Sequence, residues 1–73
     1  MIYKLYMTSP EITQPDAATT VGVVPQISFI FASQNSNYAN FKKEILADEA
    51  QLQDAEGATM SAAAAKEFVA TLP

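Results

Sequence analysis

Two prolines limit how the N-terminal third of this chain can fold. Pro10 and Pro15 lie in the stretch from Thr8 to Thr20, which is otherwise rich in serine and threonine. Proline fixes φ and lacks the N–H that a helix interior needs, so a continuous helix is excluded here. We therefore expect an extended connection or arm. A loop of about 13 residues is uncommon in a compact domain and is more often functional or held by a partner, which is a first indication of a docking protein.

Two β-prone segments flank this arm. Residues 2–7 (IYKLYM) are predicted to form a strand, since they are rich in β-branched and aromatic residues. Val21–Phe31 is a second such segment, but Gly22 and Pro25 interrupt it and favour an edge position or a break in two. Paired together, the segments would form a small sheet or hairpin whose edges either close the protein's own core or pair with another chain.

A helix is predicted after the second segment. Residues 33–37 contain serine and asparagine side chains that hydrogen-bond to nearby backbone groups, which ends a strand and caps a helix. Tyr38, Phe41 and Ile45 follow at the spacing of one buried helical face, with Leu46 as a further candidate. The two aromatic residues are therefore predicted to be core residues rather than ligand-binding ones.

A second, shorter helix is predicted near the C-terminus. Residues 55–57 carry a turn signal, in which Gly57 can adopt a positive φ. Ser61 is a candidate N-cap for a helix over residues 62–72 that ends at Pro73.

These elements predict an α+β fold in a single domain. Residues 1–26 are expected to supply the N-terminal strand, in a small sheet or hairpin, and the extended arm. Residues 27–73 are expected to form a small β-α-turn-α domain with two amphipathic helices. The predicted core of this part combines the apolar faces of both helices: Tyr38, Phe41, Ile45, Phe68, Val69 and Leu72.

The composition excludes several kinds of chemistry. The 73 residues include no cysteine and no histidine, so disulfides, thiolate metal sites, histidine zinc ligands and histidine bases are absent. Such a small core indicates stabilisation by oligomerisation or docking. Eight acidic residues against four lysines give a net charge of −4, which argues against a nucleic-acid partner. No apolar run reaches the roughly 18 residues that span a bilayer, so we expect no membrane partner and synthesis in the cytoplasm.

Acidic residues offer two candidate sites, and both are weak. Asp54 could begin a calcium loop, but the twelfth position counted from it is Ala65 rather than a glutamate, and Gly57 comes two places too early. Asp48 and Glu49 are adjacent and would point in different directions on a helix, so they are not expected to act as an acid/base pair. We therefore predict no enzymatic activity, no metal and no cofactor.

Three short motifs resemble small proteins of tailed bacteriophages. They are ISFIF at residues 27–31, NSNY at 35–38 and FKKEI at 41–45. In that group an I-P-F strand leads into N-x-D-Y-x-x-F and an amphipathic helix. Here Ser28 replaces the proline and Asn37 replaces the aspartate, while LQDAEG at 52–57 is similar to the group's later turn. The resemblance covers residues 24–72 and implies a structural or virion-accessory protein without a catalytic role.

The leading hypothesis is therefore a non-enzymatic virion protein that docks in many copies on a larger phage assembly, at the capsid surface or the head-to-tail region. It would be made in the host cytoplasm. One alternative is a small acidic phage-encoded regulator that binds and inhibits a host protein; another is a tail or tail-fibre accessory protein. The residues expected to contact the partner are the apolar ones of the N-terminal part: Ile2, Tyr3, Tyr6, Ile12, Val23 and Val24.

Overall fold

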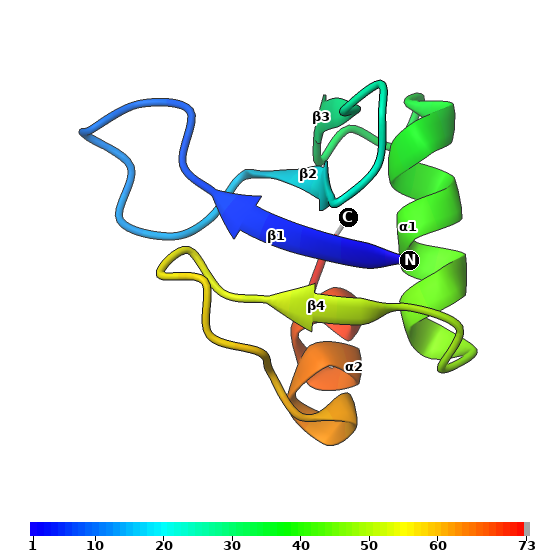
Figure 1. The fold of residues 1–73 in the computed structure, drawn as a ribbon. Coiled ribbons are helices and arrows are strands. Elements are labelled where there is room, and N and C mark those ends of the chain that lie inside the picture. Colours follow the sequence, from blue (N-terminus) through cyan, green and yellow to red (C-terminus); the bar gives the residue numbers. More distant parts are fainter. Residues whose placement is uncertain (73) are drawn as a thin grey trace.

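A computed structural model describes residues 1–72 and has the expected α+β fold, with one mixed sheet and two helices. The sheet order is β3-β2-β1-β4, and both helices contribute to the core on one face of the sheet (Figure 1). In chain order the elements are β1 (Ile2–Tyr6), β2 (Ala17–Val21), β3 (Ser28–Ile30), α1 (Ser36–Leu46), β4 (Gln51–Gln53) and α2 (Ala62–Ala70).

The predicted N-terminal arm is partly wrong, because its second half is a strand inside the sheet. β2 pairs antiparallel with β1, from Ile2 opposite Val21 to Tyr6 opposite Ala17, and it pairs with β3 on its other side. Both prolines of the arm precede β2, so nothing in residues 17–21 prevents strand pairing. Of the predicted arm, only the loop before β2 lacks regular structure, and β1 and β2 belong to the same sheet as β3 and β4.

The second predicted strand is confirmed only in part. Val21 ends β2 and residues 28–30 form β3, while residues 22–27 form the loop between them. Gly22 has a φ of +77°, a conformation that L side chains rarely adopt, which explains why the β-prone run breaks at this position. β1 therefore pairs with β2 and not directly with the segment around residues 27–31.

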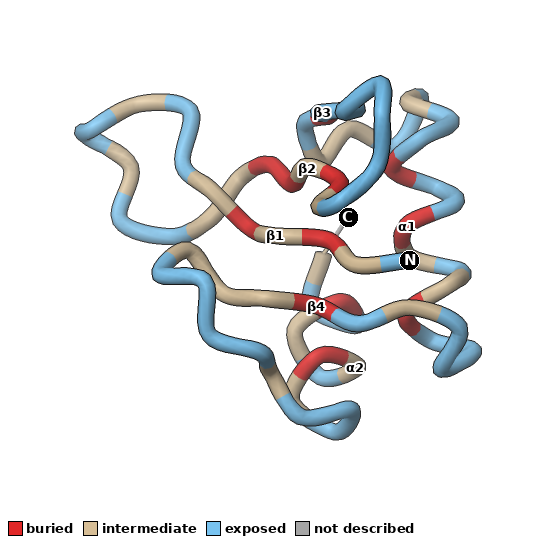
Figure 2. The backbone as a smooth tube through the Cα atoms, in the orientation of Figure 1, coloured by how far each residue is buried: buried red, intermediate tan, exposed pale blue. Residues whose placement is uncertain are grey.

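The core lies between the sheet and the two helices (Figure 2). Alternate residues of the strands point into it, among them Tyr3, Leu5 and Phe29. The Tyr3 ring meets the rings of Phe29 and Phe41 edge-on, at centroid distances of 5.9 and 5.1 Å. Such aromatic pairs stabilise a core beyond the area that they bury.

The predicted helical core is largely confirmed. The helical residues Tyr38, Phe41, Ile45 and Val69 are buried, and Phe68 and Leu72 are partly buried against them. Leu46 was a wrong candidate, because it is 50% exposed.

The predicted caps and turn are confirmed. Asn35 accepts a hydrogen bond of 3.1 Å from the backbone N–H of Tyr38, and Ser61 accepts one of 3.1 Å from that of Ala64. In the turn after β4, Asp54 accepts from two backbone N–H groups, and Gly57 has a φ of +88°. The predicted end of the second helix at Pro73 lies outside the described residues. β4 is the segment before this turn, and its parallel pairing with β1 was not predicted.

Candidate partner surface

Tyr3 must be removed from the predicted contact residues. Its side chain is only 4% exposed, since it points into the core between β1 and α1. A docked partner cannot reach this ring without opening the core, so Tyr3 stabilises the fold instead. The alternation of side chains along β1 explains the error, because its neighbours in the strand point to the opposite face.

The other predicted contact residues lie at two opposite ends of the sheet. Ile2 pairs with Val21, next to the β2–β3 loop that carries Val23 and Val24. Tyr6 and Ile12 lie at the other end, at and within the β1–β2 loop. The length of β2, about 16 Å for five residues, separates the two groups. The structure therefore brings together only Ile2, Val23 and Val24.

The sheet face opposite the helices has no covering element within residues 1–72, as Figure 1 shows. Ile2, Lys4 and Tyr6 of β1 point to this face, because Tyr3 and Leu5 point into the core. Ile2 and Tyr6 are half-buried in their own sheet and accessible from this side.

The β2–β3 loop presents an apolar tip. Val24 is 98% exposed and Val23 is 38% exposed. The peptide bond between Val24 and Pro25 is cis. A single fully exposed valine is ordinary on a protein surface, but here it stands beside a second exposed valine.

Hydrogen bonds hold the base of this loop. The backbone N–H of Thr20 donates to the Ile27 carbonyl at 2.9 Å, and the Ile27 N–H donates to the Thr20 hydroxyl at 2.9 Å. The Gln26 side-chain amide donates to the Thr19 hydroxyl at 3.0 Å. Thr20 is only 4% exposed, so its hydroxyl is a buried anchor. These bonds fix Gln26 and Ile27 at the base of the loop against β2.

A shallow depression lies at the foot of the same loop. Its volume is about 380 Å³, and it is lined by Lys4, Gln26 and Val23 together with residues 19–22. Lys4 makes no ion pair within residues 1–72. A partner side chain that carries an oxygen acceptor would find the Lys4 ammonium there as a donor.

Sequence reasoning missed the apolar residues on and beside β3. Ile27 is 41% exposed and Ile30 is 54% exposed, whereas Phe29 between them is buried. The alternation in Ile27–Phe31 was visible in the sequence, but it does not tell which set of residues faces the core. The pairing of Phe29 with Ala18 settles this point.

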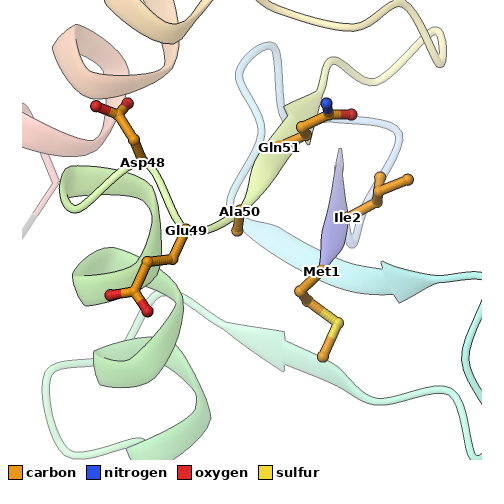
Figure 3. A pocket seen from close by; sticks show the side chains of 6 residues that line it. All are labelled: Met1, Ile2, Asp48, Glu49, Ala50 and Gln51. Atoms are coloured by element: carbon orange, nitrogen blue, oxygen red, sulfur yellow. The ribbon is translucent and has the colours of Figure 1, made fainter.

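A second depression, of about 370 Å³, lies beside the N-terminus and the start of β4. Figure 3 shows that the Asp48 and Glu49 side chains diverge from each other there. Asp48 instead forms an ion pair of 2.7 Å with Lys66 of α2. The two carboxylates thus point away from each other, and Asp48 is engaged with α2.

Tyr3, Tyr38 and Asp16 have shifted pKa values, and the surroundings of each side chain in the fold explain the shift. Burial, and then the hydrogen bond to Glu44 and its charge, raise the pKa of Tyr3. Burial raises the pKa of Tyr38. The hydroxyl and backbone N–H of Thr8 donate to the Asp16 carboxylate at 2.6 and 2.9 Å and lower its pKa. Thr8 and Asp16 lie on either side of the β1–β2 loop, so this contact ties the two ends of the loop together.

Within residues 1–72, no group of three or more acidic, cysteine or histidine side chains is placed to hold a metal ion. In the same residues no helix has both the length and the apolarity to cross a bilayer. Comparisons of this chain with protein-family models, with curated proteins and with solved structures found no match.

Proposed function

We propose that this protein is a non-enzymatic structural protein of a tailed-bacteriophage particle, which docks on a larger assembly at the capsid surface or the head-to-tail region. One observation carries the proposal: the side chain of Val24 is 98% exposed at the tip of a loop whose base is held by a buried threonine. The phage setting comes from the resemblance of residues 24–72 to small phage proteins.

The loop has the physical properties of a docking element. Its conformation is held by the Thr20–Ile27 hydrogen bonds, so little ordering entropy opposes binding. Burying the Val24 side chain in a partner contributes about 1.5 kcal/mol or more. Val23 and Ile2 lie at the same end of the sheet and extend the contact, and Lys4 in the depression adds a polar group that can orient it. We name Ile2, Lys4, Val23 and Val24 the loop-end surface.

The proposed docking is weak for a single copy, because the loop-end surface is small. A standard interface buries about 800 Å² per partner, which is about a sixth of the 4623 Å² of accessible surface of this protein. Attachment to a repeating lattice compensates for weak single contacts only where neighbouring copies also contact each other and so act as linked binding units.

The test is quantitative mass spectrometry of purified particles of the source phage, set against the infected-cell lysate. Many copies per particle are expected. Complete absence from particles would overturn the virion assignment and favour a regulator that acts in the infected cell.

A matched pair of variants locates the docking surface. Val24→Asp places a charge at the tip of the loop, and Leu46→Asp places one on a 50% exposed residue at the end of α1. We expect Val24→Asp to lower the copy number at least about tenfold, the effect of roughly 1.4 kcal/mol, and Leu46→Asp to leave it unchanged. Normal incorporation of Val24→Asp would show that the loop-end surface is not the docking surface.

A further inference from the structure

We propose that β3 pairs antiparallel with β3 of a second copy of this chain, which joins two four-stranded sheets into one sheet of eight strands. This inference concerns the edge of the sheet and is independent of the phage assignment. It rests on the backbone geometry of β3, on the side chains around it and on the distribution of charge along the chain.

The backbone of β3 leaves an open edge. β3 is the end strand of the sheet, with β2 on one side only. On that side the Ile27 carbonyl accepts from Thr20, and the Phe31 N–H donates to the Asp16 carbonyl. In an antiparallel ladder the paired residues alternate, so Phe29 also bonds to β2. The N–H and C=O groups of Ser28 and Ile30 consequently point away from the sheet.

The opposite edge of the sheet is closed. On the outer side of β4, the Leu52 carbonyl accepts a hydrogen bond of 2.8 Å from the Met60 N–H. An isolated bridge between Gln53 and Thr59 continues this cover. Residues 58–60 therefore protect β4, and nothing equivalent within residues 1–72 is hydrogen-bonded along β3. Of the two edges, β3 is the one that can accept another strand.

The edge is complementary to itself. With a twofold axis through Phe29, Ser28 of each copy lies opposite Ile30 of the other. Each such pair can exchange two N–H···O bonds, so the pairing forms four in all. The Ile30 carbonyl already accepts from the Ala32 N–H at 2.9 Å, but a carbonyl oxygen has two lone pairs and can accept a second bond. An isologous contact of this kind closes at two copies.

Charge explains why a second copy fits this edge. All 12 charged residues of the chain lie within residues 1–16 and 42–67, so the 25 residues from Ala17 to Phe41 carry none. Two copies with a net charge of −4 repel each other over most of their surface, but β3 and its flanks bring no like charges together. Edge strands are protected from pairing by charges, by proline or by a very short length; β3 carries no charge and no proline, so its length of three residues is the protection that remains.

The side chains around β3 add an apolar margin. Ile27 and Ile30 are 41% and 54% exposed on either side of the buried Phe29. A standard complex buries about 800 Å² per partner. A strand of three residues with these flanks buries less than that. The dimer is therefore expected to be weak and dependent on concentration, with a Kd in the range of about 10 µM to 1 mM.

Sedimentation velocity of the purified protein between about 10 µM and 1 mM tests the association. We expect the weight-average mass to rise with concentration, from that of one chain toward that of two. The Ile30→Lys variant should remain monomeric, because a dimer would place two lysines, one from each copy, at the paired edge. Leu46→Lys is the matched control, since Leu46 is similarly exposed but lies at the end of α1, and it should dimerise normally.

Amide hydrogen exchange followed by NMR tests the geometry. At about 1 mM protein, half or more of the chains are paired for any Kd up to about 1 mM, so the Ser28 and Ile30 N–H groups should become at least about twofold more protected, and Ile30→Lys should abolish this gain. A protein that stays monomeric at 1 mM would overturn the proposal. A dimer that survives Ile30→Lys, or one that adds no protection at these two amides, would overturn it as well. Because only purified protein is used, failure here is separate from failure of the virion assignment.

Discussion

The phenolic hydroxyl of Tyr3 donates a hydrogen bond of 2.7 Å to Oε2 of Glu44, which ties the first strand to the first helix across 41 positions of the chain. The Tyr3 ring is buried against Phe29 and Phe41, while its hydroxyl reaches the margin of the core where the Glu44 carboxylate is half-buried. A residue that looked like a surface contact in the sequence thus fixes the position of α1 on the sheet.

Replacing Tyr3 by phenylalanine should lower the free energy of unfolding by about 1 to 2 kcal/mol. The ring remains in the core, but the partly buried Glu44 carboxylate loses a donor, and hydrogen bonds to charged groups lie at the upper end of the usual range. Urea denaturation measures the change. Tyr6→Phe is the matched control, since Tyr6 lies on the opposite face of β1 and its hydroxyl has no hydrogen-bond partner within residues 1–72. Equal losses in both variants would contradict the role of Glu44.

Alkaline pH should unfold the protein progressively above about pH 10. Burial first, and then Glu44, raise the pKa of Tyr3 in the folded state above its usual value near 10. The unfolded chain therefore loses this proton first as the pH rises, so it binds fewer protons than the folded chain and stability falls. The slope approaches about 1.4 kcal/mol per pH unit for each such tyrosine.

The same titration separates the contribution of Tyr3 from that of Tyr38. Burial also raises the pKa of Tyr38, so a smaller alkaline loss should remain in Tyr3→Phe. Free energies of unfolding at pH 8, 10 and 11 for both proteins provide the measurement. An identical pH dependence in the two would show that the Tyr3 proton is not held by the fold.

Asp48 carries the strain at the end of α1. It follows the C-cap Ala47 with a φ of +60°, in the left-handed region that glycine and asparagine adopt at the lowest steric cost. Its ion pair with Lys66 joins two exposed side chains, so it is worth at most about 1 kcal/mol. Asp48→Gly and Asp48→Ala both remove this pair, but only alanine keeps the steric cost.

Asp48→Gly should therefore be more stable than Asp48→Ala by about 1 kcal/mol, a difference of roughly 4 to 8 °C in Tm for a domain of this size. Thermal unfolding followed by circular dichroism measures it. Asp48→Asn is the control for the ion pair, because asparagine also tolerates the left-handed region. If the alanine variant matched the glycine variant, the helix would end in a different conformation from the one described.

The sequence predicted the helices better than the sheet, for physical reasons. Helix caps are local, so Asn35 and Ser61 were identifiable from the residues that follow them. β2 reads AATTV, with two small residues that carry little strand signal. Ala17 and Ala18 are both fully buried, but only Ala18 belongs to the aromatic core, since Ala17 points to the opposite face of the sheet. Such burial depends on partners distant in sequence, which no local pattern contains.

The surface residues were harder to place for a related reason. Val23 and Val24 were predicted as contact residues within a β-prone segment, and the structure exposes both of them in the loop between β2 and β3. Tyr3 was misplaced because an isolated strand with apolar residues on both faces does not reveal which face is covered. β3 has an open edge because it is the last strand in the sheet order. This order depends on which strands pair with each other, and the sequences of the separate strands do not reveal their partners.

The buried hydroxyl of Thr20 should control the order of the β2–β3 loop. Thr20→Val keeps the shape of the side chain but removes the acceptor of the Ile27 N–H, which should cost about 1 to 3 kcal/mol. Amide exchange should accelerate at Ile27 and across the loop, and urea denaturation should report the lost stability. Thr19→Val is the matched control: the Thr19 hydroxyl also bonds to the loop, but Thr19 is partly exposed and water can replace those bonds.

Since the proposed docking depends on a loop ordered in advance, Thr20→Val should also lower incorporation into particles although Val24 itself is unchanged. Normal exchange at Ile27 in this variant would show that Thr20 does not hold the loop.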